Sequence, residues 1–246
     1  MSYKEHAKYW EWDAYDRSGE FEFWCALAKN YGSKVLSAMG ATGQAGAYMA
    51  QKGFDVTVLD YTKEMISEGK KKYASIKNLC FAQGDIRDYS AKKPFDFVFI
   101  ASADLHHLTS IGEINKALRC LNKALRSNGG LALKLWLPGD ESFESAQRVF
   151  EAHKAAFTDR RVYKKGYTRF DAVSKKVEIR QTVYVEFMDG KKEDFRHNVD
   201  LQLYEKEELL TAFYNNGFML EKQFGGIDFS PYREGESDWF VLLSKK

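Results

Sequence analysis

The chain has 246 residues, of which 44% are hydrophobic and 15% aromatic, so it is long and apolar enough to bury one full core. Lysine and arginine number 37 against 35 acidic residues, and this balance indicates no extended basic surface for nucleic acid or an anionic membrane. No stretch approaches the roughly 20 apolar residues that cross a bilayer, and residues 1–10 lack the apolar core of a secretion signal. We therefore expect a cytoplasmic globular protein with neither nucleic-acid nor membrane partners.

The first half of the chain predicts strands that alternate with helices. An apolar run over residues 34–39 stops at Gly40, and residues 45–53 have a helical pattern. Residues 54–60 predict a second, β-branched strand, and the helix after it begins near Thr62. Such strand–helix units predict a parallel sheet covered by helices. Further strands are expected at 78–85, 95–102 and 129–136, with a helix over 111–126.

The pattern changes after Trp136. Residues 164–197 contain stretches with a period of two, and the sequence Met-Asp-Gly-Lys at 188–191 predicts a turn between two antiparallel strands. A helix near Glu205, a strand over 218–224 and a last strand over 238–246 complete the chain. We expect a single domain over residues 1–246, which comprises an N-terminal aromatic lid and helix (1–30), a Rossmann-like core (31–136 and 201–246) and a β-rich cap insert (137–200).

Neither the cysteines nor the adjacent histidines have metal-ligand spacing. Cys25, Cys80 and Cys120 lie far apart and none belongs to a C-x-x-C pair, so we expect free thiols in a reducing compartment. The side chains of His106 and His107 diverge, and no Cys, His or Glu stands at ligand spacing from them. The sequence therefore predicts no bound metal.

The stretch 37–46, SAMGATGQAG, fits two different cofactors. Its G-x-x-G-x-x-G pattern, beginning at Gly40, is typical of the nucleotide loop of an extended short-chain dehydrogenase, and it also fits an altered S-adenosylmethionine loop. Both interpretations need a helix N-terminus and an acid, Asp60, that accepts hydrogen bonds from ribose hydroxyls. A dehydrogenase also needs a Tyr-x-x-x-Lys pair after the fifth strand, whereas the spacing Tyr73 to Lys77 precedes the third. The nicotinamide interpretation is therefore the weaker alternative.

Three features beyond this loop resemble class I S-adenosylmethionine-dependent methyltransferases, over nearly the whole chain. They are the acidic residue Asp85, which follows Gly84 at the end of the predicted third strand, the passage LRSNGGLALKLW at 125–136, and the pattern GFMLEKQFGG at 217–226 followed by a final strand. The resemblance implies an α/β, Rossmann-like methyltransferase fold, with a mostly parallel seven-stranded sheet, an antiparallel last strand and an antiparallel β cap insert. It also implies S-adenosylmethionine as the cofactor.

The resemblance further implies a cofactor site at the strand ends. In this family the first loop carries an acid, then glycines at alternate positions; here Ser37 stands for the acid, and Met39 and Ala41 stand for the first two glycines. Asp60 would hold the ribose hydroxyls, and Asp85 would accept a hydrogen bond from the adenine amino group. The full set of expected cofactor residues is Ser37, Gly40, Ala41, Gly43, Asp60, Tyr61, Met65, Asp85, Ile86, Ala101 and Ser102.

Histidines and aromatic residues are expected to build the acceptor side. His106 and His107 follow the fourth strand, and either could act as a general base or instead cap the next helix or pack beneath the pocket. The N-terminal segment looks like the aromatic lid of small-molecule methyltransferases, with surface packing as the alternative. The expected substrate-binding residues are Tyr9, Trp10, Tyr15, His197, Phe229 and Tyr232.

These features predict in-line transfer of a methyl group from S-adenosylmethionine to an amine or hydroxyl of a small molecule. The substitutions at Ser37, Met39 and Ala41 leave an alternative open, which is a catalytically inactive protein of the same fold that binds a nucleoside or a partner. The antiparallel insert offers a strand edge that could pair with a second copy, so a homodimer is also left open.

Overall fold

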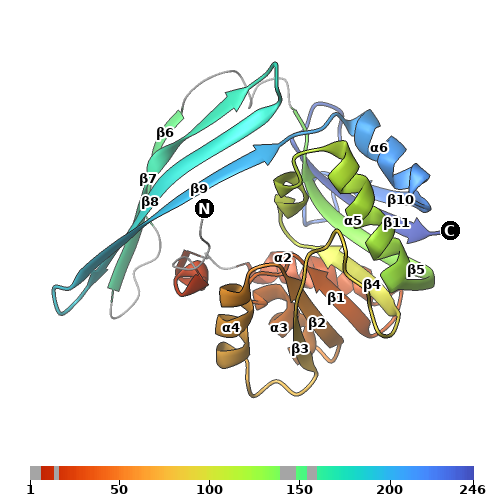
Figure 1. The fold of residues 1–246 in the computed structure, drawn as a ribbon, viewed down its shortest axis with the longest axis horizontal. Coiled ribbons are helices and arrows are strands. Elements are labelled where there is room, and N and C mark those ends of the chain that lie inside the picture. The colour runs from red at the N-terminus through yellow and green to blue at the C-terminus, as the bar shows by residue number, and fades with distance from the viewer. Residues whose placement is uncertain (1–6, 14–16, 139–147, 154–159) are drawn as a thin grey trace.

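The computed structural model describes residues 7–13, 17–138, 148–153 and 160–246, and Figure 1 shows their arrangement in two sheets. Tyr15, one of the expected acceptor residues, lies outside the described residues. The strands of the larger sheet are β1 (Lys34–Ala38), β2 (Asp55–Asp60), β3 (Leu79–Gln83), β4 (Phe95–Ile100), β5 (Leu125–Trp136), β10 (Phe218–Phe224) and β11 (Asp238–Lys245).

The larger sheet has the predicted mixed topology, in the order β10-β11-β5-β4-β1-β2-β3. β1 pairs in parallel with β2 and β4, β2 with β3, and β4 with β5, whereas β11 runs antiparallel to both β5 and β10. The prediction of a mostly parallel seven-stranded sheet with an antiparallel last strand is therefore confirmed.

Helices cover both faces of this sheet, because its strands carry apolar side chains on both sides. The helices are α2 (Ser18–Ala28), α3 (Gln44–Gln51), α4 (Lys63–Lys72), α5 (Ile111–Ala124) and α6 (Lys206–Asn215), with short 3-10 helices η1 (Trp10–Asp13) and η2 (Ala103–His107). On β1, Val35 packs in a cluster with side chains from α2 and α3, and Leu36 packs in another with side chains from α5 and α6. Figure 1 shows α5 and α6 side by side on their face of the sheet.

The smaller sheet is an antiparallel meander of β6 (Arg148–His153), β7 (Arg160–Asp171), β8 (Lys176–Phe187) and β9 (Lys192–Gln202). Figure 1 shows it extending beyond the larger sheet. Two apolar clusters hold it to the rest of the chain, one around Tyr9 and Phe195 and one in which Trp136 packs on Val199 and its neighbours. This sheet is the antiparallel insert expected from the sequence, and we call it the cap sheet.

The topology fixes where a ligand can bind. β1 is hydrogen-bonded to β2 on one side and to β4 on the other. The strands that follow β1 are therefore added first on one side of it (β2 and β3) and then on the other side (β4 and β5), so the strand order reverses at β1. In open α/β sheets, ligands bind outside the carboxyl ends of the strands at such a switch point. The expected cofactor residues lie at or after the carboxyl ends of β1 to β4, along this edge of the sheet.

Candidate active site

The loop after β1 keeps a backbone shape that glycine usually provides. Met39 and Ala41 have φ angles of 53° and 49°, in the left-handed region, and Gly43 has a φ angle of 85°. For L-residues this conformation costs about 1–2 kcal/mol per residue. Gly40 is required for a different reason, because a Cβ atom there would lie 2.8 Å from Cγ1 of Val58. The loop therefore holds a glycine-type conformation although two of its residues are not glycine.

Asp60 ends β2 and directs its carboxylate toward this loop. Its Oδ2 accepts the N–H of Ala41 and its Oδ1 accepts the N–H of Thr62, both at 2.8 Å. Burial raises the pKa of Asp60, and the two backbone hydrogen bonds oppose that rise. The Thr62 side chain also hydrogen-bonds to Asp60, and the carboxylate, with about four acceptor positions, keeps capacity for a ribose hydroxyl.

Asp60 and Asp85 line one cavity of about 320 Å³ at the carboxyl ends of β1, β2 and β3, and we call it the cofactor cavity. Its walls combine carboxylates with apolar side chains, a mixture that suits ribose hydroxyls and an adenine ring. Four more of the expected cofactor residues line it: Ala41, Tyr61, Met65 and Ile86. The remaining loop residues of that set do not line it; Ser37 is buried beneath the loop, and Gly40 and Gly43 shape the backbone.

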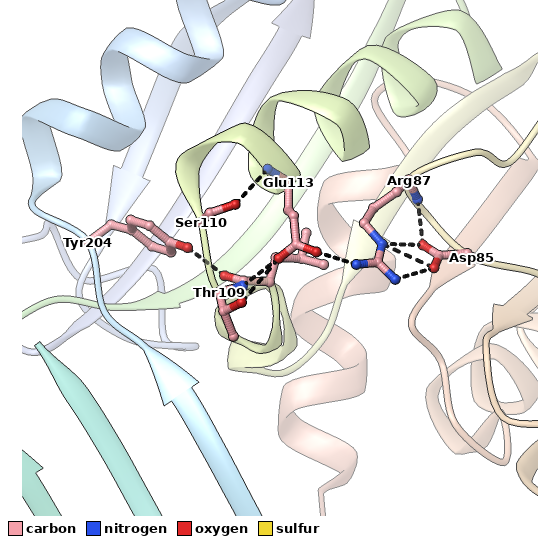
Figure 2. Close-up of polar contacts among 7 residues, drawn as sticks. Asp85, Arg87, Thr109, Ser110, Glu113 and Tyr204 are labelled. Atoms are coloured by element: carbon pink, nitrogen blue, oxygen red, sulfur yellow. Dashed lines mark hydrogen bonds and ion pairs between the residues drawn. The ribbon is translucent and has the colours of Figure 1, made fainter. Parts of the chain in front are cut away.

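Asp85 is held by an arginine that the sequence interpretation did not single out. Figure 2 shows Arg87 between Asp85 and Glu113, with its Nε donating to both carboxylate oxygens of Asp85 at 2.9 and 3.0 Å. A second nitrogen of Arg87 pairs with Glu113, whose other oxygen accepts the N–H of Thr109 at 2.8 Å. The hydrogen bonds from Arg87 hold the pKa of Asp85 below its usual value. The backbone N–H and the Nη2 of Arg87 also donate to Asp85, so each carboxylate oxygen already receives two donors, and Asp85 is a fixed, ionised group in the cofactor cavity.

A second cavity, of about 400 Å³, lies between the larger sheet and the cap sheet, and we call it the acceptor cavity. Ala101 and Ser102, which follow β4 and were expected beside the cofactor, line this cavity instead of the first. His197 of β9, an expected substrate-binding residue, also lines it and is 6% exposed. The cavity further contains the charged side chains of Arg17, Glu20, Lys134 and Lys164.

The two cavities share three lining residues, Trp10, Asp104 and His107. Trp10 comes from η1, whereas Asp104 and His107 come from η2, directly after β4. The two cavities therefore adjoin at these three side chains. The structure therefore brings the predicted lid residue Trp10 and the predicted base His107 to one place.

Asp104 and His107 can move a proton at this place. His107 Nε2 lies 3.8 Å from Asp104 Oδ1. Burial raises the pKa of Asp104 to about 7, and the negative charge of Asp60 adds to that rise. Burial lowers the pKa of His107, so its ring is neutral at neutral pH. The Asp104 carboxylate can therefore accept a proton near pH 7, whereas the neutral ring of His107 is a weaker base than an ordinary imidazole.

His106 does not have the catalytic role that the sequence predicted as an option. It is fully buried and lines neither cavity. Its Nδ1 lies 2.8 Å from the carbonyl oxygen of Gln202, and its Nε2 accepts the N–H of Trp136 at 2.9 Å. Because both ring nitrogens are used by backbone groups, His106 joins the end of β9 to the end of β5. We therefore assign it a structural role.

Three expected acceptor residues lie away from both cavities. The ring of Tyr9 stacks on Phe195 of the cap sheet at a centroid distance of 4.9 Å. Phe229 packs on Phe23 at 4.8 Å, and Tyr232 packs near Trp239 at 6.2 Å. These aromatic rings anchor segments of the fold.

Sequence reasoning missed Asp104, Arg17 and Glu20. Arg17 donates to Glu20 at 2.6 Å and to the Ser102 hydroxyl at 3.3 Å, so these charged groups form one wall of the acceptor cavity. The position of Asp104 just after a buried strand was an available signal, since charged groups at such ends face the site in this topology. Within the described residues, no group of three His, Cys, Asp or Glu side chains could hold a metal ion.

The sheet order and the paired cavities define a Rossmann-like fold of the class I methyltransferase type. Residues 35–129 match a family model described as "Methyltransferase domain". The crystal structure of an S-adenosylmethionine-dependent methyltransferase from Clostridium acetobutylicum ATCC 824 is similar, with a TM-score of 0.79 and 13% identity over 99% of this chain and 98% of that one. The sugar N-methyltransferase KedS8 from Streptoalloteichus sp ATCC 53650 gives a TM-score of 0.78 and 16% identity over 98% and 92% of the two chains.

A curated protein of Bacillus subtilis (strain 168), YqeM, which bears a methyltransferase name, is 26% identical over 125 residues. This match covers 50% of the present chain and 47% of YqeM, so the chain spans about half the length of that relative. The match of residues 35–129 to the methyltransferase domain model and the shared fold agree with the predicted class, an S-adenosylmethionine-dependent methyltransferase of class I. The structural neighbour CalS10, an amino pentose methyltransferase from Micromonospora echinaspora, was solved with S-adenosylmethionine bound, the cofactor that the sequence predicts here.

Proposed function

We propose that the protein transfers a methyl group from S-adenosylmethionine in the cofactor cavity to an amine of a small molecule in the acceptor cavity. The observation that carries this proposal is the junction of the two cavities at Trp10, Asp104 and His107. The cofactor supplies a methyl group that is already activated on a sulfonium, so alignment of the two ligands can provide much of the rate acceleration.

The residues of the cofactor cavity fit the adenosyl group. In this proposal the Asp60 carboxylate accepts hydrogen bonds from the ribose, and the ionised Asp85, which Arg87 holds, supplies negative charge near the adenine amino group. Met65 and Ile86 provide apolar walls, and both are buried. This side of the proposal uses the residues that the family resemblance implied.

The acceptor side favours an amine over a hydroxyl. An amine attacks through a neutral lone pair and loses a proton that the Asp104–His107 pair can accept near pH 7, whereas a hydroxyl is a far weaker acid and needs a stronger base. The aromatic face of Trp10 can stabilise positive charge at the reacting nitrogen. Methylation of nitrogen in a sugar by the structural neighbour KedS8 supports the same choice.

The experiment has two steps. Calorimetry with S-adenosylmethionine, S-adenosylhomocysteine and NADPH tests the cofactor; we expect the two adenosyl compounds to bind and NADPH not to bind. A panel of matched small amines and alcohols is then tested for S-adenosylhomocysteine release, with Asp104→Asn as the variant and Asp228→Asn on a distant surface loop as the control. Transfer to alcohols alone would overturn the amine assignment. Cofactor binding without transfer to any acceptor would instead favour the inactive, ligand-binding alternative.

A further inference from the structure

The N-terminal segment carries a carboxylate that binds three distant side chains. Glu11, next to Trp10 in η1, accepts the hydroxyl of Thr42 at 2.7 Å and the hydroxyl of Tyr73 at 2.9 Å, and it pairs with the ammonium group of Lys72. The Glu11 side chain is only 9% exposed. Glu11 lines neither cavity, so it does not touch a ligand in them.

One of these three partners belongs to the cofactor loop. Thr42 is 3% exposed and directly follows Ala41, which has a left-handed backbone and whose N–H is bound by Asp60. A glycine at position 41 would adopt this conformation freely, whereas alanine disfavours it. The loop of this chain therefore needs an external contact to keep the orientation of its N–H groups, and the Glu11–Thr42 hydrogen bond supplies one.

We propose that Glu11 is a positioning residue for cofactor binding, which holds the loop around Ala41 in its left-handed form and sets Trp10 at the junction of the two cavities. This inference rests on the cofactor site of the proposed function, not on the identity of the acceptor. It explains how a loop with Met39 and Ala41 in left-handed positions is held in a binding-competent shape. The partners Lys72 and Tyr73 at the end of α4 fix the carboxylate itself.

The test is calorimetry with S-adenosylhomocysteine on the full chain, combined with hydrogen exchange of the backbone amides of residues 39–43. We expect Glu11→Ala to weaken binding about tenfold, the effect of losing one charge-assisted hydrogen bond. Exchange at residues 39–43 should become faster in the ligand-free protein, and Glu11→Gln should be intermediate.

The decisive variant is the double substitution Glu11→Ala with Ala41→Gly. A glycine at position 41 no longer needs the external contact, so we expect this variant to recover most of the lost affinity. The matched control is Glu11→Ala with Asn128→Gly, since Asn128 has a φ angle of 58° far from the loop in β5 and should give no recovery.

The outcomes separate the two proposals. Wild-type protein that fails to bind S-adenosylhomocysteine would overturn the proposed function, while the exchange of residues 39–43 would still test whether Glu11 holds the loop. Wild-type binding that Glu11→Ala leaves unchanged would overturn only the role of Glu11. Equal recovery by Ala41→Gly and Asn128→Gly would show that Glu11 acts through general stability and would also overturn it.

Discussion

Replacement of Asp104 by asparagine should stabilise the protein at neutral and alkaline pH. Burial raises the pKa of this carboxyl from its usual 3.8 to about 7. A carboxyl with a higher pKa in the folded protein binds more protons when folded, so the free energy of unfolding falls as the pH rises through this window. The pKa rise of about three units, at about 1.36 kcal/mol per unit, sets an upper limit of about 4 kcal/mol on the gain in the free energy of unfolding. Because 27% of the Asp104 side chain is exposed, we expect about half of that.

The assay is urea unfolding of Asp104→Asn and wild type between pH 4 and pH 8, with thermal melts at each pH. For a chain of this length, about 2 kcal/mol corresponds to a rise in Tm of about 4–8 °C at pH 8. The advantage of the variant should grow from pH 4 to pH 7 and then stay constant. Asparagine is nearly isosteric, so the packing is unchanged.

Asp85 provides the matched control with the opposite sign. The hydrogen bonds from Arg87 lower the pKa of Asp85, so its ionised form stabilises the folded protein above its usual pKa, and this stabilisation is lost as the pH falls through the lowered pKa. Asp85→Asn should therefore be less stable than wild type at pH 8, and the deficit should shrink in acid. If Asp104→Asn is no more stable than wild type at pH 8, or differs from it by the same amount at every pH, then the Asp104 charge does not destabilise the folded protein.

Three further predictions concern other parts of the chain. Asp60→Asn should weaken S-adenosylhomocysteine binding at least tenfold by calorimetry. The asparagine NH2 group would face one of the two backbone N–H groups that the carboxylate now accepts, and two donors cannot pair. Unchanged affinity would contradict the role of Asp60 in cofactor binding. His106→Phe should lower the free energy of unfolding by about 2–4 kcal/mol in urea, since two backbone groups lose buried partners, whereas a smaller loss would mean that these bonds are weak. Cys80 is exposed, whereas burial raises the pKa of the Cys25 thiol to about 11. A thiol reagent should therefore label Cys80 in the native protein and Cys25 only after unfolding. Labelling of Cys25 in the native protein would contradict its burial.

Local sequence patterns predicted most of the strands, because each strand of the core is a short apolar run with a clear end. The run at 34–39 corresponds to β1, and the Asp-Gly turn at 189–190 separates β8 from β9, with Gly190 at a φ angle of 87°. The turn between β7 and β8 carries no such signal. Lys175 takes the left-handed position there with a φ angle of 54°, and lysine has no local preference for it.

The residues that line the first cavity were predictable where a family motif coincides with the end of a strand, as at Asp60 and Asp85. The acceptor residues were not, because aromatic character alone does not distinguish a ring that lines a cavity, such as Trp10, from one that anchors a sheet, such as Tyr9. The bond between Glu11 and Thr42 joins positions 31 residues apart, and no local pattern encodes that choice of partner.

The uncharged ring of His106 has a consequence for acid tolerance. With a backbone carbonyl at Nδ1 and a backbone N–H donated to Nε2, only one neutral tautomer satisfies both neighbours, and burial lowers the pKa of the ring to about 4. The folded protein therefore resists protonation of this histidine below its usual pKa of about 6.5, and the stability it loses on acidification is concentrated where β9 meets β5. Acidification should therefore weaken this junction between the cap sheet and the larger sheet, which the two apolar clusters also hold together.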